Sequence, residues 1–571
     1  MGQGAAVSGF ELSRRNALAF AALSPAALVG CKSNHAIAGR FTGTSPERGH
    51  LLRDARTIAA PSVTRTVRTL IAGGGVAGLS AARALRLQGM DDFALLELED
   101  SAGGNARAGS MAGMAHPIGA HYLPVPSDAA YETQDFLEEL GIRQRVSGRW
   151  QYEERYLCHS PQERLFMNGA WQDGLLPLAD VGPATLAQYG KFAQLVERWR
   201  KTGGFQIPRA YTLQALQAMA QLAMPFNAYL DAQGLTDTTL RWYLDYCCRD
   251  DYGAGVEVVS AWAGIHYFAA RHGFGMPGDK AADGERDKQQ GGVLTWPEGN
   301  AYLTHALAAP LGERVHTGRV VLQITEDKSG LTVLALNVQT QAVERWQAQR
   351  CIVALPVFIA QRVVQNAPDF LRHAAQHTSY ASWLVANVHT NAPLLDAGGG
   401  AAPSWDNVIF NPVQTGGVAG DTAGSASPTG LGYVDAMHQS TRTAPGPSVL
   451  TYYRALGTSV QARRSLLAKP WAQHKDETLA DLRAAHPDID QRAVQVNITR
   501  YGHAMAVPTP AFIREIGLQP KQILLKQLSN KERLGATSAP STQRLRFAHS
   551  DWAGYSVFEE AFRAGWLAAQ S

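Results

Sequence analysis

Three glycines spaced as GxGxxG, Gly73, Gly75 and Gly78, carry the clearest chemical signal in this sequence of 571 residues. A short apolar run that favours a strand, residues 67–72, precedes them, and a run rich in helix formers, residues 79–85, follows them. Gly73 permits a tight turn, Gly75 lets the backbone approach a pyrophosphate, and Gly78 allows the helix to pack closely on the strand. The positive end of the helix then faces a negative ligand, so the pattern predicts a dinucleotide-binding βαβ unit.

An acidic residue completes this unit. A second strand-like run, residues 93–97, ends at Glu97, which lies 24 residues after Gly73. A carboxylate at this position accepts hydrogen bonds from ribose hydroxyls. Val76 and Ala77 begin the helix, and we expect them to lie against the diphosphate. A GxGxxG alone is a weak signal, but here strand, glycines, helix, second strand and acid follow in the required order.

Length and composition indicate a folded protein with more than one domain. The chain is longer than one compact core allows, and 45% hydrophobic and 18% charged residues are ordinary values for a soluble fold. The formal net charge is only +3, and no long basic run occurs, so we expect no nucleic-acid partner. The five cysteines match no zinc-site spacing, and we expect no metal. Four of them are interpreted as small buried hydrophobic residues: Cys158, Cys247, Cys248 and Cys351.

The first 31 residues predict an export signal rather than part of the fold. Arg14 and Arg15 precede an apolar stretch, residues 17–30, that is too short to span a bilayer. The arginine pair resembles a twin-arginine signal, and the residues before Cys31 resemble a lipoprotein cleavage box. This predicts twin-arginine export to the periplasm and allows a membrane tether through Cys31. Residues 32–63 are polar and predict a linker.

The residues after Glu97 distinguish FAD from NAD. Gly103, Gly104 and Arg107 form a Gly-Gly-x-x-Arg pattern. A strand that ends in an acid and is followed by this pattern resembles the flavin-containing amine oxidase superfamily, which also includes phytoene desaturases. The resemblance implies FAD as the cofactor, with the glycine pair against its diphosphate and Arg107 near the flavin and its phosphates.

A segment in the middle of the chain extends the resemblance. Val321 begins a Val-x-x-Ile run, and the resemblance implies that its side chain lies near the adenine. Residues 351–356 form an apolar run that ends in proline, as does the strand that returns to the FAD domain in this superfamily.

The C-terminus resembles the last strand and helix of the same superfamily. Asp551 is the candidate for the acid that contacts the FAD ribityl chain, and Val557 lies where the final helix faces the flavin. His549 and Ser550 stand where a glycine is usual, which shifts these contacts by about a residue.

These segments imply an α/β fold with a Rossmann-like FAD-binding domain and an α+β substrate domain, both discontinuous. The FAD-binding domain is expected to contain residues 64–110, 290–360 and 500–571, and the substrate domain residues 111–289 and 361–499. Within the latter, residues 183–271 predict helices with many aromatic side chains, which either line a pocket or form the core. A charge cluster among them favours a solvated helix end: Asp245, Arg249, Asp250 and Asp251. Residues 394–432 favour a long surface loop.

Because FAD supplies the redox chemistry, the protein must orient the substrate near flavin N5 and exclude water. The resemblance makes Tyr501 the candidate aromatic residue at the flavin face. His503 is the candidate for polarising the substrate or handling a proton, and His116 and His121 are further candidates.

Two residues common in the superfamily are missing. Many of its amine oxidases place a lysine near flavin N5, but residues 329–468 contain no lysine, and Trp383 or its neighbours occupy this place. The absence weighs against rapid reaction with oxygen. No cysteine follows Cys351, so the cysteinyl–flavin bond of some members is excluded, and we expect non-covalent FAD.

Three functions fit these observations. The first is an FAD-dependent oxidoreductase that resembles flavin amine oxidases and oxidises a small amine by hydride transfer to flavin N5, with an unidentified electron acceptor. The second is a desaturase, dehydrogenase or isomerase of a lipid-like or polyene substrate. The third is a binding protein that kept the fold without redox activity, and the intact glycines and Glu97 argue against it.

Overall fold

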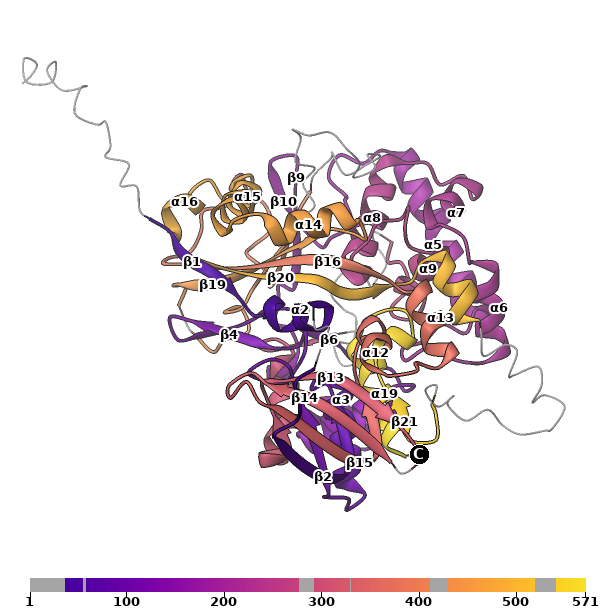
Figure 1. The fold of residues 1–571 in the computed structure, drawn as a ribbon. Helices are drawn as coiled ribbons and strands as arrows, with labels where there is room; N and C mark the ends of the chain where they lie inside the picture. Colours follow the sequence, from indigo (N-terminus) through magenta and orange to yellow (C-terminus); the bar gives the residue numbers. More distant parts are fainter. Residues whose placement is uncertain are drawn as a thin grey trace, which may run out of the picture. The chain divides into compact units, whose positions relative to one another are not determined.

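The computed structural model describes residues 36–54, 58–276, 292–328, 330–410, 430–442, 444–518 and 541–570. Residues 38–571 form one compact unit. The expected export signal, with Arg14, Arg15 and Cys31, lies outside the described residues. Two sheets, each assembled from distant parts of the chain, dominate the compact unit (Figure 1).

The first sheet contains the predicted βαβ unit. Its strand order is β12-β3-β2-β15-β14-β13, and β21 pairs with the end of β15. The strands are β2 (Val63–Ala72), β3 (Phe93–Leu96), β12 (Val315–His316), β13 (Arg319–Glu326), β14 (Leu331–Asn337), β15 (Val343–Val353) and β21 (Leu545–Phe547). Strands β3, β2 and β15 pair in parallel at the centre of this sheet. The C-terminal residues of these strands are apolar and buried, as expected for strands covered on both faces. The two strands and the helix predicted around the glycines are confirmed.

Helices α3 (Val76–Leu87) and α19 (Phe558–Gln570) pack together beside this sheet (Figure 1). Their contact is so close that a Cβ on Gly565 would lie 1.9 Å from the carbonyl oxygen of Ala77. Ser80 donates a hydrogen bond of 2.6 Å from Oγ to the carbonyl of Phe562. The last helix of the chain therefore supports the first helix of the nucleotide-binding unit.

The second sheet has the order β1-β20-β16-β19-β18-β17-β9-β10. Its strands are β1 (Ala38–Thr42), β20 (Ala493–Val507), β16 (Ser379–Thr390), β19 (Ser448–Ala455), β18 (Gly430–Asp435), β17 (Asp406–Ile409), β9 (Glu163–Met167) and β10 (Ala170–Asp173). The expected domain boundary at residue 500 falls inside β20, which pairs with β16 along almost its whole length. The expected loop at 394–432 contains β17 and the start of β18, because these residues pair with β9 and β19.

Residues 38–54 also differ from the sequence-based expectation of a linker. β1 pairs in parallel with β20 and forms the edge of the second sheet, and α2 (Pro46–Asp54) follows it. The Arg500 guanidinium of β20 lies 3.6 Å from the centroid of the Phe41 ring, and this contact helps to hold β1 against β20. We call residues 38–54 the N-terminal strap, because the segment contacts both the second sheet and the residues that follow β3.

The predicted helices of the substrate domain gather at one end of the second sheet (Figure 1). They are α5 (Pro183–Thr202), α6 (Leu213–Gln221), α7 (Phe226–Ala232), α8 (Thr238–Tyr252) and α9 (Ala261–Ala269). Their aromatic side chains form the largest core cluster with apolar residues of the sheet. The four described cysteines are buried, as predicted.

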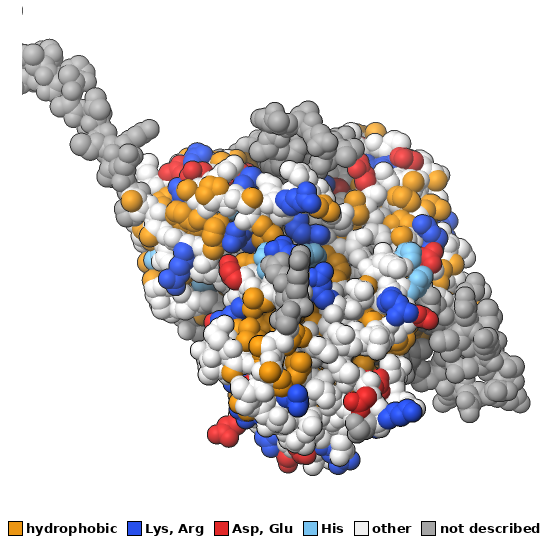
Figure 2. Space-filling model, viewed as in Figure 1, with side chains coloured by type: hydrophobic (Ala, Val, Ile, Leu, Met, Phe, Trp, Pro, Cys, Tyr) orange, Lys and Arg blue, Asp and Glu red, His pale blue; other side chains and the backbone are white. Residues whose placement is uncertain are grey.

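The remaining elements connect or cover the two sheets. The helices are α4 (Tyr131–Glu139), α11 (Ala301–Ala308), α12 (Val357–Val363), α13 (Asp369–His377), α14 (Val460–Ala468), α15 (Trp471–Arg483), α16 (Ile489–Arg492) and α17 (Pro510–Phe512), with the shorter turns η1 (Glu154–Tyr156), η2 (Ala309–Arg314), η4 (Ile513–Gly517) and η6 (Ser550–Trp552). Three strand pairs complete the set: β4 (Ala108–Met111) with β5 (Met114–Pro117), β6 (Tyr122–Pro124) with β11 (Val293–Thr295), and β7 (Arg143–Val146) with β8 (Arg149–Tyr152). Within the described residues, no helix has both the length and the apolar character needed to cross a membrane. Acidic, basic and hydrophobic side chains are interspersed on the face shown in Figure 2.

The contact between α3 and α19 yields a stability prediction. Gly565→Ala should lower the free energy of unfolding by about 1–3 kcal/mol, because the added methyl group would overlap backbone atoms. The matched control is Gly190→Ala within α5, where the nearest atom lies 3.8 Å from the new Cβ. There the change should stabilise the protein by about 0.5–1 kcal/mol. Denaturant unfolding measures both, and equal stability of Gly565→Ala and the wild type would contradict the packing.

Candidate active site

The glycines of the two motifs face one another and form a backbone-lined cradle. A Cβ on Gly75 would point at the Cα of Gly104, 3.9 Å away, and a Cβ on Gly104 would lie 3.1 Å from the Cα of Gly75. Gly73 has a φ of 103°, and a Cβ on it would approach the carbonyl oxygen of Ala354 to 2.3 Å. A Cβ on Gly78 would lie 1.9 Å from the carbonyl oxygen of Gly73. Close backbone contact or a positive φ therefore requires glycine at positions 73, 78 and 104, whereas a Cβ on Gly75 would make only an ordinary van der Waals contact but would point into the cradle.

The start of α3 opens toward this cradle. The helix begins at Val76 with Gly75 as its N-cap, and no side chain caps its first amides, among them that of Ala77. Gly103 donates a backbone hydrogen bond of 2.7 Å to Gly74 and holds the two glycine segments together. An uncapped helix N-terminus beside a cradle without Cβ atoms suits a diphosphate.

Glu97 lies at the end of β3, where the sequence predicted a ribose-binding acid. Its Oε2 accepts a hydrogen bond of 2.8 Å from the Gly74 amide, and its Oε1 accepts one of 2.8 Å from the Glu99 amide. Burial raises the pKa of Glu97, while these two hydrogen bonds act in the opposite direction. The backbone of β13 begins beside it, since Arg319 N–H donates to the Glu97 carbonyl at 2.8 Å. Val321 is buried in β13, and its contact with adenine stays a prediction.

The N-terminal strap contacts the residues that follow Glu97. Ser45 donates two hydrogen bonds to Glu99, one from its amide (2.9 Å) and one from Oγ (2.7 Å). Arg107 donates from Nε to the Gly104 carbonyl (2.9 Å) and from Nη2 to the Gly43 carbonyl (2.5 Å). The strap thus completes the surroundings of Arg107. Sequence reasoning missed it, because residues 38–54 are polar overall and only the apolar side chain of Phe41 marks the strand.

Asp551 is only 1% exposed and joins three segments of the chain. Its Oδ2 accepts hydrogen bonds from the Val357 amide (2.9 Å) and the Tyr380 hydroxyl (2.5 Å). His549 Nδ1 lies 3.0 Å from Oδ1. Burial acts to raise the pKa of Asp551, but His549, Tyr380 and Val357 outweigh it and the pKa is lowered. His549, which departs from the superfamily pattern, is therefore a partner of Asp551, and contact between Asp551 and the ribityl chain stays a prediction.

A cavity of about 210 Å³ is lined by strands of the second sheet, by residues 119–124, by the end of α8 and by the start of α19. Tyr501 and Trp383, opposite one another on β20 and β16, both line it. The Tyr501 hydroxyl donates to the Ile118 carbonyl at 2.7 Å, and burial raises the pKa of Tyr501 to about 12. Val557, just before α19, also lines the cavity. Tyr501 and Trp383 thus line one cavity, and their expected positions relative to the flavin stay predictions.

His121 lines the cavity as well and stacks on Tyr453, with ring centroids 4.6 Å apart. Burial lowers the pKa of His121 to about 4, so the imidazole is neutral near pH 7. His116 is buried outside the lining residues.

The expected role of His503, to polarise the substrate or handle a proton, stays a prediction. His503 is absent from the lining residues and stacks instead on Phe358, with ring centroids 4.4 Å apart. The pairing of β20 with β16 explains this: Tyr501 faces Trp383 and Met505 faces Ala381, so β20 carries two extra residues. These extra residues bulge out of the pairing, which leaves Tyr501 and Met505 in the cavity wall and His503 outside it. Burial, and then Arg463, lower its pKa to about 4.

The interpretation of the charge cluster on α8 as a solvated helix end is wrong. Asp250 and Asp251 line the cavity, because the C-terminal half of α8 is covered by the core. Asp251 pairs with Arg271 at 2.9 Å. Burial raises the pKa of Asp250 to about 7, and Asp251 adds to the shift. Glu559, in the first turn of α19, lines the cavity too, and burial raises its pKa to about 7.

Asp250, Asp251 and Glu559 together form an acidic wall of the cavity. In the sequence, the only sign of this wall was the presence of two of these acids in an aromatic-rich helix. The aromatic side chains of the substrate-domain helices were expected either to line a pocket or to form the core, and the structure places them in the core. None of them lines the described cavity: Trp242, Tyr243, Tyr246, Tyr252, Trp262, Tyr267 and Phe268.

The comparisons with known proteins identify the family. The model of the flavin-containing amine oxidoreductase family matches residues 76–571, so the chain belongs to this family. Similar solved structures include putrescine oxidase bound to putrescine, with a TM-score of 0.61 and 18% identity over 89% of this chain and 99% of that chain. Cyclohexylamine oxidase from Brevibacterium oxydans IH-35A has a TM-score of 0.57 and 16% identity over 88% and 98%.

A fatty acid isomerase from P. acnes that produces CLA is also similar, with a TM-score of 0.57 and 14% identity over 88% of this chain and 97% of that chain. At these identities the structural likeness establishes the fold alone. A comparison with curated protein sequences finds no match.

Family and fold together confirm an α/β FAD-dependent oxidoreductase. FAD fits the residues described above, because the glycine cradle, the uncapped start of α3 and Glu97 match a diphosphate followed by a ribose. The hypothesis of a binding protein without redox activity is set aside.

Glu97 gives a direct test of cofactor binding. Glu97→Gln keeps the acceptor for the Gly74 amide but removes the charge, so FAD affinity should fall about 10- to 100-fold, as expected for a lost hydrogen bond to a charged group. Titration of the apoprotein with FAD measures the affinity. Glu197→Gln, at an exposed site on α5, is the control and should leave FAD binding unchanged. An unchanged affinity in Glu97→Gln would remove the assigned role of this acid.

Proposed function

We propose that this protein oxidises a small cationic amine. The observation that carries the proposal is the acidic wall of the cavity, formed by Asp250, Asp251 and Glu559, with Arg271 already paired to Asp251. Carboxylates in a poorly solvated cavity attract an ammonium group and repel a fatty-acid carboxylate. Bound FAD supplies the oxidising chemistry by accepting a hydride from the substrate carbon.

The side chains around the cavity have separate tasks. Tyr501, Trp383 and Tyr453 provide apolar walls that orient the carbon next to nitrogen and exclude water. The Asn300 Oδ1 atom has no hydrogen-bond partner within the described part of the chain, so it is available to accept one from the substrate. An amine must lose a proton before it gives up a hydride, and a carboxyl group with a pKa of about 7, such as Asp250 or Glu559, is well placed to receive it.

The cofactor is proposed to be held without a covalent bond, because no cysteine follows Cys351 in the sequence. Since residues 329–468 contain no lysine and Trp383 lines the cavity, we propose an electron acceptor other than oxygen.

The alternative function is a desaturase, dehydrogenase or isomerase of a lipid-like substrate. The aromatic walls and Arg271 favour that alternative, and the similarity to a fatty acid isomerase is compatible with it.

An anaerobic titration tests the proposal. Small amines should bleach the absorbance bands of the holoenzyme, and unsaturated fatty acids should leave them oxidised. The amine concentration that gives half of the bleaching should rise as the pH falls from about 8 to about 6. The reason is that Asp250 and Glu559, with pKa values of about 7, lose their negative charge over this range.

The matched variants are Asp250→Asn and, as a control, Asp173→Asn at an exposed site on β10. Asp250→Asn should raise the half-bleaching concentration about tenfold at pH 8, which corresponds to about 1.4 kcal/mol, and should weaken the pH dependence. Bleaching by fatty acids alone would overturn the amine proposal in favour of the alternative.

We further propose that the protein is exported by the twin-arginine route and acts in the periplasm, with a lipid tether at Cys31. The support is the pattern Arg14-Arg15 before an apolar stretch, and the requirement that a flavoprotein fold around its cofactor before export. Replacing Arg14 and Arg15 by lysine should retain the protein in the cytoplasm, as measured by cell fractionation. Arg149→Lys, on the exposed strand β8, is the control. Normal export of the double variant would refute the route.

A further inference from the structure

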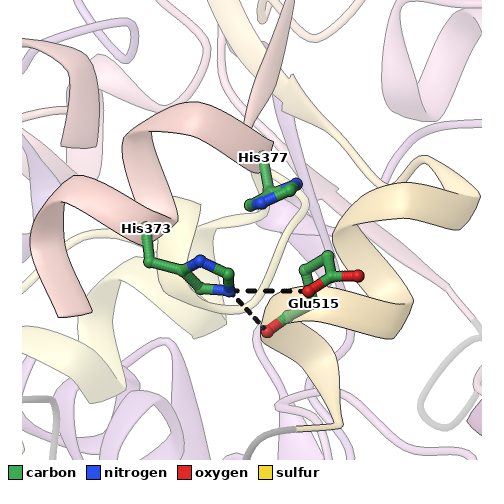
Figure 3. A group of neighbouring side chains, drawn as sticks. All are labelled: His373, His377 and Glu515. Atoms are coloured by element: carbon green, nitrogen blue, oxygen red, sulfur yellow. Dashed lines mark hydrogen bonds and ion pairs between the residues drawn. The ribbon is translucent and has the colours of Figure 1, made fainter. Parts of the chain in front are cut away.

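A group of three side chains outside the cavity has the composition of a metal site (Figure 3). His373 and His377 lie one turn apart on α13, and Glu515 lies on η4 (Ile513–Gly517), the turn that follows β20 and α17. One potential ligand atom from each side chain lies within 4.8 Å of the other two. Within the described ranges, no other set of histidine, cysteine and acidic side chains forms a comparable group.

We propose that His373, His377 and Glu515 bind one divalent transition-metal ion, with Zn²⁺ as the expected ion. Two imidazole nitrogens and one carboxylate oxygen suit a metal of intermediate softness, whereas Mg²⁺ and Ca²⁺ prefer oxygen ligands alone. Cysteine spacing gave no sign of this site, because it uses no cysteine.

The local geometry is close to what coordination requires. Residues four apart on a helix share one face, so both imidazoles of α13 can approach one ion. Zinc bonds of about 2.0–2.2 Å in a tetrahedral arrangement place two ligand atoms roughly 3.4 Å apart. His373 Nε2 lies 3.7 Å from Glu515 Oε2, and the two imidazole centroids are 4.6 Å apart. Small side-chain rotations are therefore sufficient, with no movement of the backbone.

Solvent access also fits an ion with an open coordination position. The side chains of His373 and Glu515 are 34% and 46% exposed. Water can therefore occupy the fourth position, and an ion can enter without opening the fold. His373 Nε2 also has the backbone carbonyl of Glu515 as a neighbour at 3.3 Å, and this contact links the two segments.

The position of the site indicates what metal binding would do. Ser379, which follows α13, pairs with Val507, which precedes η4, at one end of the β16–β20 pair. That strand pair carries Trp383 and Tyr501 of the cavity wall. An ion shared by α13 and η4 would therefore clamp this end of the pair and stabilise the native state by mass action. The expected role is structural, and it does not depend on the identity of the substrate.

Metal binding is tested on the full-length holoenzyme without an affinity tag, after treatment with EDTA. Calorimetric titration with Zn²⁺ should show about one equivalent bound per chain, and Zn²⁺ should raise the Tm. The double variant His373→Ala/His377→Ala should bind Zn²⁺ at least 100-fold more weakly, and Glu515→Gln, which keeps the shape of the side chain, about tenfold more weakly. His305→Ala, at an exposed histidine of α11, is the control and should bind as the wild type does.

Far-UV circular dichroism and flavin content verify that each variant is folded, so a loss of binding reports on the ligands. Zinc binding of equal affinity in the wild type and the double variant would overturn the proposal. So would the absence of binding to the wild type at about 100 µM Zn²⁺, because an assembled site with three ligands is expected to bind well below that concentration.

Discussion

The close approach of backbone to backbone around α3 is the constraint on which the site depends. One side of the helix rests on the turn at Gly73, since a Cβ on Gly78 would overlap the carbonyl of that residue. Another side receives α19, whose Gly565 contacts the carbonyl of Ala77. Side chains at either position would push the helix away and move its positive end from the cradle. The orientation of the start of α3 thus depends on the absence of side chains at Gly78 and Gly565.

The second determinant is the distribution of charge inside the protein. Arg271 neutralises Asp251 at the cavity, but Asp250 and Glu559 have no such close ion pair among the described contacts, and burial raises the pKa of each to about 7. Asp551 shows the opposite behaviour, because His549 and two hydrogen-bond donors stabilise its charged form. Similar carboxyl groups therefore have different tasks: Asp551 holds segments together, whereas the acids at the cavity can exchange protons with a ligand.

Sequence reasoning succeeded where the signal is local. Short-range patterns in the sequence predict the glycine turn between β2 and α3, the position of Glu97 at the end of β3, and the final helix. It failed where pairing between distant segments decides the outcome. The position of His503 outside the cavity wall was not foreseen, because only the pairing with β16 reveals the bulge in β20. Asp250 and Asp251 look like a solvated helix end until the core that covers α8 is known, and the strap looks like a linker until β20 offers it an edge.

The parallel sheet around β15 has a consequence for the order in which the protein can mature during synthesis. β15 is flanked by β2, made early, and by β21 (Leu545–Phe547), made almost at the end of the chain. Asp551, Val557 and α19 are translated later still. A ribosome-bound chain that lacks its last 30 residues has the glycine motif but neither the buried carboxylate at Asp551 nor the helix that supports α3. A chain cut before β21 therefore keeps the glycine motif but lacks the segments that pack against β15 and α3.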